Sequence, residues 1–146
     1  MRTLHLILFF AASGVRRGAI PELKIKHLKQ MSNDCLAVTI YEGSHEEYVT
    51  FINTEAREAL NLYLEQRKHD DEHLDPEHPV FRAKYQLAIA KPKPFSEKSV
   101  SNMILRAKRN AGVDLGDSPN LLCHTFRRRF NTILKLNENA NTPLIE

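Results

Sequence analysis

The stretch that decides the fold is LAVTIYEGSHEEYVTFI, at residues 36–52. Both of its ends are rich in β-branched and aromatic residues, and Gly43-Ser44 between them is a turn signal. This pattern predicts a β-hairpin formed by residues 36–41 and 48–52. Elsewhere the apolar residues have helical spacing, so the sequence predicts an α+β domain that is mainly helical and contains one small antiparallel hairpin.

Apolar spacing and capping residues predict helices on both sides of this hairpin. The expected helices cover residues 2–12, 17–28, 54–68, 97–111 and 122–136. The first is apolar nearly all round, so we expect other elements to enclose it. Asn53 or Thr54 and Ser96 are N-caps for the third and fourth helices, and Gly14 and Gly112 end the first and the fourth. Ala111 and Ile133 are expected to face the core.

Charge is divided unevenly along the chain. The 146 residues carry a net charge of +3, but residues 84–135 alone carry 11 Lys and Arg against 3 Asp and Glu. Such clustering indicates an anionic partner, nucleic acid first, because Lys and Arg gain affinity when counterions leave phosphates. A solvated basic face is the alternative. The composition, 42% hydrophobic and 27% charged, is that of a single globular domain and excludes a disordered tail or a repeat array.

The cysteines and the N-terminus bear on location. Cys35 and Cys123 stand in no metal-ligand spacing and favour a reduced chain, so we expect a cytoplasmic protein. The N-terminus imitates a signal peptide, with Arg2, the apolar residues 4–10 and the small residues 11–13. A secreted binding protein is therefore an alternative. The apolar run is shorter than the roughly 20 residues that cross a bilayer, and no membrane partner is expected.

Two short motifs carry candidate chemistry. In His124-Thr125-Phe126-Arg127 the imidazole and the guanidinium lie one helical turn apart, so both can reach the same oxyanion. In Ser13-Gly14-Val15-Arg16 an Arg follows a helix stop, where a short loop can aim its side chain at a ligand. Read alone, the first motif is also typical of a solvated basic helix.

Together, in this order around a hairpin, the motifs resemble the catalytic domain of the tyrosine recombinase, or phage integrase, family. That family has an Arg in a TGxR-like turn, which SGVR at residues 13–16 matches, and an HxxR motif, which residues 124–127 match. The surrounding sequence looks most like archaeal members. The resemblance covers nearly all of the chain and implies the fold of the DNA breaking-rejoining enzymes.

The resemblance implies phosphoryl transfer on duplex DNA without a metal or a cofactor. Arg16 and Arg127 would hold the scissile phosphate, His124 would hydrogen-bond the same centre, and a tyrosine would form a 3′-phosphotyrosyl intermediate. Sister protomers in a synaptic complex are the further expected partners of the complete protein. Backbone contacts to DNA are expected from Arg17, Arg106, Arg109, Arg128 and Arg129.

Three departures from the family pattern bear on activity. By register Glu42 stands where the family has a Lys as general acid, and His45 is the nearby candidate proton donor, against the alternative of a polar turn residue. Ala19 stands where the family often has Glu. The family's nucleophilic Tyr follows HxxR, whereas every tyrosine of this chain precedes it: Tyr41, Tyr48, Tyr63 and Tyr85.

We therefore expect residues 1–146 to be a partial catalytic domain, without the amino-terminal DNA-clamping domain and the carboxy-terminal tyrosine segment. Alone, it should be inactive for lack of the Tyr and the hairpin Lys. A DNA-binding remnant with no chemistry is the alternative. Tyr48 and Tyr63 fall on apolar periodic positions and are expected in or at the edge of the core.

The acidic segment 69–79 contains a candidate pair of metal ligands. His69 and His73 have a spacing that could ligate a metal on a helix. The prolines and the run of acidic residues favour a solvated loop instead, followed by a short extended piece at Val80-Phe81. No metal site is expected.

Overall fold

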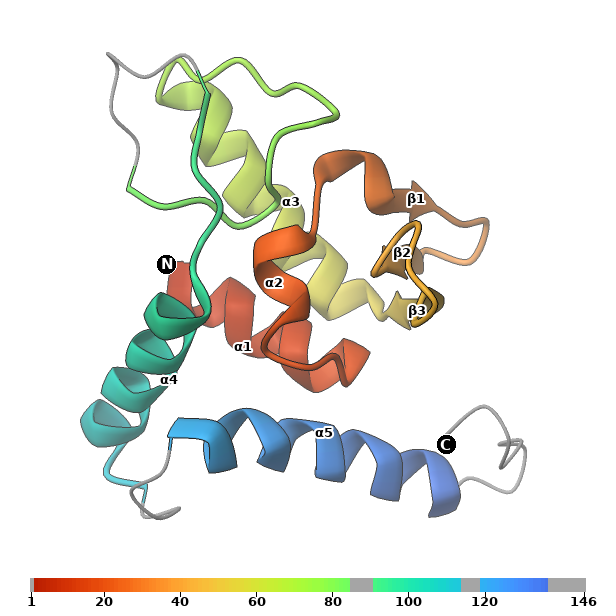
Figure 1. Cartoon of the computed structure of the whole chain (residues 1–146), viewed down its shortest axis with the longest axis vertical. Helices are drawn as coiled ribbons and strands as arrows, with labels where there is room; N and C mark the ends of the chain where they lie inside the picture. The colour runs from red at the N-terminus through yellow and green to blue at the C-terminus, as the bar shows by residue number, and fades with distance from the viewer. Residues whose placement is uncertain (1, 85–90, 114–118, 137–146) are drawn as a thin grey trace.

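The computed structural model describes residues 2–84, 91–113 and 119–136. Within them, the helices pack together and a small antiparallel sheet lies at one side of them (Figure 1), which confirms the mainly helical α+β prediction. The elements are α1 (Arg2–Ser13), α2 (Ala19–Glu22), the 3-10 turn η1 (Ile25–His27), β1 (Leu28–Gln30), β2 (Leu36–Ile40), β3 (Tyr48–Ile52), α3 (Thr54–His69), α4 (Glu97–Ala111) and α5 (Pro119–Leu136).

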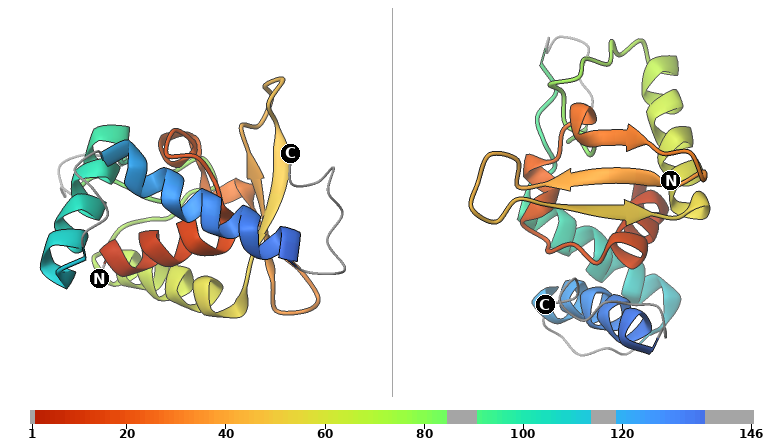
Figure 2. Two further views of the ribbon diagram at one scale, coloured as in Figure 1. Left: turned by 90° about the horizontal axis from the view of Figure 1, so that it is seen from below. Right: turned by 90° about the vertical axis from the view of Figure 1, so that its right-hand side faces the viewer.

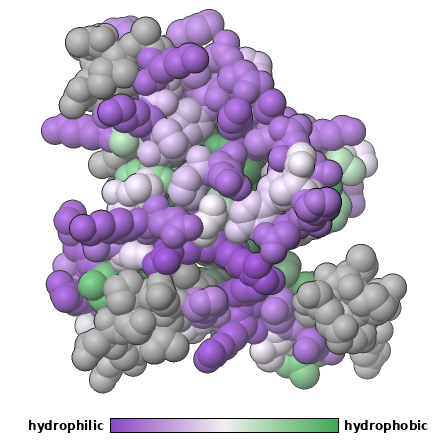
Figure 3. All heavy atoms as spheres, viewed as in Figure 1, coloured by the Kyte–Doolittle hydropathy of each residue, from purple (hydrophilic) through white to green (hydrophobic). Residues whose placement is uncertain are grey.

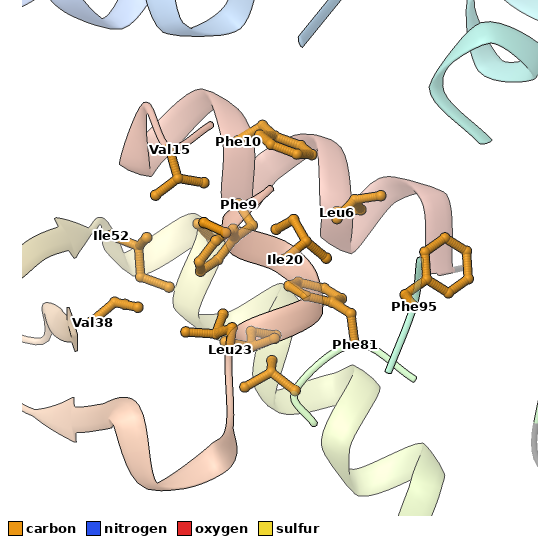
Figure 4. Close-up of a cluster of buried hydrophobic side chains, with 14 of the residues drawn as sticks. Leu6, Phe9, Phe10, Val15, Ile20, Leu23, Val38, Ile52, Phe81 and Phe95 are labelled. Atoms are coloured by element: carbon orange, nitrogen blue, oxygen red, sulfur yellow. The ribbon is translucent and has the colours of Figure 1, made fainter. Parts of the chain in front are cut away.

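Helix α1 lies at the centre of the molecule, in contact with α3, α4, α5 and β3. Its side chains Leu6, Phe9 and Phe10 are at most 1% exposed. In Figure 4 they meet Ile20 and, from the sheet, Ile52. Each large apolar side chain buried in this way contributes about 1.5–3 kcal/mol. Burial in the core thus accounts for the apolar run that imitates a signal peptide.

The sheet contains the predicted hairpin and one further strand. Strands β2 and β3 pair antiparallel from Leu36↔Ile52 to Ile40↔Tyr48, as expected. The predicted helix over residues 17–28 is wrong, because α2 ends at Glu22 and β1 begins at Leu28 and pairs with β2. The residues of β1 have no strand period of their own, and the free edge of β2 decides their conformation.

The predicted caps of α3 and α4 are confirmed. The Asn53 side chain accepts a hydrogen bond from the backbone N–H of Ala56, and Ser96 accepts one from Ser99. Gly112 ends α4 with a φ of +68°. Helix α5 begins at Pro119, earlier than expected, and lies along one side of the molecule against α1 and α4 (Figure 2).

Some burial predictions hold and others do not. Tyr63 is buried, as expected, at 5% exposed, whereas Tyr48 is 37% exposed on the edge strand β3. Ile133 is 54% exposed and Ala111 is exposed, so neither faces the core. Both lie near helix ends, where α4 and α5 extend past the elements that cover them.

The segment after α3 is not a fully solvated loop, which corrects the sequence prediction. Glu72 is 6% exposed and lies between two arginines. Its carboxylate accepts from Arg67 at 2.6 and 3.0 Å and from Arg82 at 2.6 Å. Arg67 also donates to the carbonyl oxygens of Pro79 and Val80. This buried cluster ties the segment to α3.

Candidate functional site

The turn after α1 carries Arg16, and Gly14 shapes it. Gly14 has a φ of +66°, a conformation that glycine adopts without strain. A Cβ built on Gly14 would also collide with the ring of Phe130 in α5. Both the backbone conformation and the close packing of α5 therefore require glycine at this position.

Hydrogen bonds fix this turn to the sheet and to α5. The carbonyl oxygen of Ser13 accepts from Thr50 Oγ1 of β3 at 3.0 Å, in a buried position. The carbonyl oxygen of Gly14 accepts from Arg127 Nη1 of α5 at 3.0 Å. The second bond joins the two sequence motifs, since Gly14 lies two residues before Arg16. A guanidinium has five N–H donors, so Arg127 retains donors that can reach an anion.

A third connection runs from the turn to α4. Arg17 Nη1 donates to Ser101 Oγ at 2.7 Å, and Arg17 Nη2 lies 3.4 Å from Glu97 Oε2. Ala19, at the position where the family often has Glu, is 3% exposed and packs in the core. The carboxylate beside this turn therefore comes from α4.

Arg16 itself is exposed, and its charge acts on Tyr41, where β2 ends. Burial and the neighbouring Tyr48 raise the pKa of Tyr41, and the positive charge of Arg16 acts in the opposite direction. Tyr41 has a φ of +54°, so the chain bends sharply where β2 ends. The arrangement places the Arg16 turn between the hairpin base and α5.

The other predicted site residues lie on α4 and α5. On α5, His124 is exposed one turn before the half-buried Arg127. Hydrophilic side chains cover most of the face seen in Figure 3, including that over α5. The remaining arginines are exposed: Arg106 and Arg109 on α4, and Arg128 and Arg129 on α5. The structure thus brings Arg127 to the turn of Arg16 and keeps these other cations at the surface.

The hairpin position that the family gives to Lys holds an ion-paired carboxylate. Glu42 Oε2 lies 2.8 Å from His27 Nε2 and 3.4 Å from Lys26 Nζ. The hydrogen bond from His27, together with the charge of Lys26, lowers the pKa of Glu42 despite its partial desolvation. Glu42 is therefore ionised and carries no proton to donate at neutral pH. His45 is exposed in the turn between β2 and β3.

Lys26 is a cation near the hairpin that the sequence prediction missed. It also pairs with Glu77 at 2.9 Å, and hydrogen bonds from Lys26 and Lys24 lower the pKa of Glu77 to about 2. No periodic signal marks Lys26. It reaches the hairpin because β1, which the sequence did not predict, pairs with β2.

Comparison with known proteins identifies the family. The family model described as Phage integrase family matches residues 1–146. The chain belongs to the phage integrase family. A search of curated proteins found no match.

Solved recombinase structures share the fold of this phage integrase family chain. The XerA recombinase is 22% identical with a TM-score of 0.71, over 99% of this chain and 47% of its own. The XerH site-specific recombinase bound to difH substrate, in a pre-cleavage complex, is 18% identical with a TM-score of 0.70, over 99% of this chain and 38% of its own. The integrase-family chain thus spans less than half the length of these recombinases.

Across residues 2–84, 91–113 and 119–136, no three His, Cys, Asp or Glu side chains are grouped so as to hold a metal ion. Within the same ranges, no helix has the length and apolar character needed to cross a membrane.

Proposed function

We propose that these residues are part of the catalytic domain of a site-specific recombinase, which breaks and rejoins duplex DNA by phosphoryl transfer. The observation that carries the proposal is the hydrogen bond from Arg127 to Gly14, because it joins the HxxR helix to the Arg16 turn within the family fold. A recombinase of the same fold, XerH, has been solved bound to its difH substrate. That complex supports a site-specific recombination substrate for this domain as well.

In this proposal two guanidiniums act on one phosphate. Arg16 and Arg127 would donate to the non-bridging oxygens and stabilise the negative charge that grows as the phosphorus becomes pentacoordinate. His124, one turn from Arg127, would add a hydrogen bond to the same group. The bonds that hold the Arg16 turn to β3 and α5 support this role, because preorganised donors need no rearrangement during the reaction.

The exposed cations of α4 and α5 would bind the DNA backbone on either side. Arg106, Arg109, Arg128 and Arg129 are exposed and belong to the strongly basic part of the chain. Contacts of this kind position a protein on the duplex without reading its sequence. In the complete protein, sister protomers would bring two DNA segments together.

We propose that the 146-residue polypeptide binds DNA without cleaving it. Tyr63 is buried in the core, and Tyr41 is half-buried with a raised pKa. Neither follows HxxR, as the family's nucleophile does. Glu42, ionised and paired with His27, would not protonate a leaving oxygen. These features also favour the second candidate, a DNA-binding remnant without chemistry.

The proposal predicts salt-dependent duplex binding in which both arginines take part. We expect Arg16→Ala and Arg127→Ala each to weaken binding to a 30-bp duplex about 3- to 10-fold, and to make the negative slope of log K against log salt shallower by about 0.9. Fluorescence anisotropy between 50 and 200 mM KCl measures both quantities.

Two further variants make this test specific. Arg127→Lys keeps the charge but loses the planar fork, so it should recover part of the affinity. Lys68→Ala removes one charge from the exposed end of α3, far from α5 in Figure 1, and should leave binding unchanged. Equal weakening by all four variants would contradict a localised phosphate site.

A covalent adduct separates the two candidate functions. The 146-residue chain should give no denaturant-resistant protein–DNA band with nicked duplex. The same assay on a longer chain that supplies a tyrosine after HxxR should give one if the protein is a recombinase. A negative result there, with DNA binding intact, would favour the remnant.

A further inference from the structure

Arg17 directly follows Arg16, yet its guanidinium lies against α4. Its side chain is 28% exposed, and Nη1 donates to the buried Ser101 at 2.7 Å. Nη2 forms the ion pair with Glu97 at 3.4 Å. A DNA phosphate would have to compete with the carboxylate of Glu97 for this guanidinium. These contacts favour a role within the protein.

Glu97 is close to the turn backbone as well as to Arg17. A Cβ built on Gly18 would come within 2.6 Å of Glu97 Oε1 and 3.6 Å of the Tyr41 hydroxyl. The N-terminal turn of α4 therefore closes over Gly18, directly after Arg17. Ala19, the next residue, is buried and carries no carboxylate. Glu97 supplies one from a neighbouring element.

Arg16 thus lies between two attachments of its turn. On one side, Gly14 accepts the hydrogen bond from Arg127. On the other, Arg17 bonds to α4. Fixing the backbone on both sides limits the directions in which the Arg16 side chain can leave it, and such restriction of a functional group is the usual task of supporting contacts.

We propose that Arg17 is a positioning residue, which acts through Ser101 and Glu97 to aim Arg16 at the phosphate and does not itself bind DNA. This inference rests on the proposed function of Arg16. It gives Arg17 a different role from the backbone contact that the sequence predicts. Three readouts distinguish the two roles.

The first readout is a double-mutant cycle on duplex binding, with the same 30-bp DNA. If Arg17 acts through Arg16, Arg17→Met should weaken binding about 3-fold in the wild-type background and not at all beside Arg16→Ala, because residues that act as a unit are non-additive. Arg109→Ala is the control: it should weaken binding by the same factor in the wild-type and the Arg16→Ala backgrounds. If Arg17→Met weakens binding by the same factor in both backgrounds, the inference is overturned.

The second readout is the salt slope. Removing a residue that contacts phosphate decreases the magnitude of the negative slope of log K against log salt by about 0.9. Arg17→Met should leave the slope of the Arg16→Ala background unchanged. A further decrease of about 0.9 in that background would show that Arg17 contacts DNA and would overturn the inference.

The third readout needs no DNA. The Nε–Hε NMR signal of Arg16 should shift in Arg17→Met, Ser101→Ala and Glu97→Gln, and return toward its wild-type position in Arg17→Lys. The last three variants keep a cation at position 17, so they serve if Arg17→Met does not fold. An unchanged Arg16 signal in these variants would overturn the inference.

Failure of the proposed function is distinct from failure of this inference. If Arg16→Ala has no effect on DNA binding, Arg16 does not act on phosphate and the proposed function fails. The NMR shifts then still decide whether Arg17 orients Arg16. If Arg16→Ala weakens binding but the NMR signal of Arg16 does not shift when Arg17 is substituted, the proposed function stands and the inference is wrong.

Discussion

At the scale of single residues, Gly14 joins the two halves of the candidate site. Its positive φ turns the chain out of α1, and its bare Cα allows Phe130 of α5 to pack on the turn. Its carbonyl oxygen then accepts from Arg127. One residue thus sets the direction of Arg16 and the distance of α5 at once.

A Gly14→Ala substitution should therefore be costly. We expect a loss of about 1–2 kcal/mol from the left-handed backbone and about 1–3 kcal/mol more from displacing Phe130. Gly43→Ala is the matched control, since Gly43 has a φ of +79° and nothing within 4 Å of the added Cβ. Urea unfolding measures both variants. Equal losses for the two would show that α5 does not pack on Gly14.

At the scale of elements, the buried cluster of Arg67, Glu72 and Arg82 connects α3 to the segment that follows it. Burial raises the pKa of Glu72, and the hydrogen bonds from both arginines outweigh this, so its pKa lies below the ordinary value. The folded state therefore binds a proton at Glu72 less readily than the unfolded state. The stability that Glu72 contributes is present above pH of about 4.5 and is lost as pH falls through its folded pKa.

Glu72→Gln should remove this contribution. The substitution keeps the shape but leaves two buried guanidiniums without a counter-charge, which costs about 3–5 kcal/mol. The free energy of unfolding should also fall less steeply below pH 4.5 than in the wild type. Glu65→Gln is the control, because Glu65 pairs with Lys68 at the surface and exposed pairs contribute at most about 1 kcal/mol. A loss no larger than that of the control would contradict the importance of the cluster.

At the scale of the whole molecule, α1 carries a buried histidine that makes stability depend on pH near neutrality. His5 is 4% exposed beside Tyr63, with Nδ1 unpaired within the described residues, and burial lowers its pKa. The unfolded state thus binds a proton at His5 more readily than the folded state, so the stability that His5 contributes is fully present above pH of about 6.5 and falls as pH decreases from there.

His5→Phe tests this dependence. The ring keeps its contact with Tyr63 and cannot take a proton, so the melting temperature should change less between pH 7.5 and pH 5.5 than in the wild type. His73→Phe, on an exposed residue of the loop, is the control and should keep the wild-type pH dependence. An unchanged profile in His5→Phe would show that His5 is not the group responsible.

The sequence predicted the features that local patterns determine. The β-branched and aromatic runs with the Gly43-Ser44 turn predicted the hairpin, and Asn53 and Ser96 predicted the helix starts, because turns and caps act over a few residues. Strand β1 and the burial of Glu72 escaped prediction, since both depend on pairing with neighbouring segments that no periodic pattern marks. Motif order found Arg16 and Arg127, whereas the contacts of Arg17 and Lys26 depend on which elements become neighbours.

The most direct test of the central claim is a crystal structure of this chain bound to a DNA duplex. We expect Arg16 and Arg127 both to donate, at about 3 Å, to non-bridging oxygens of one phosphate, with His124 at the same group. Guanidiniums about 12 Å or more apart, or bound to phosphates of different nucleotides, would contradict it.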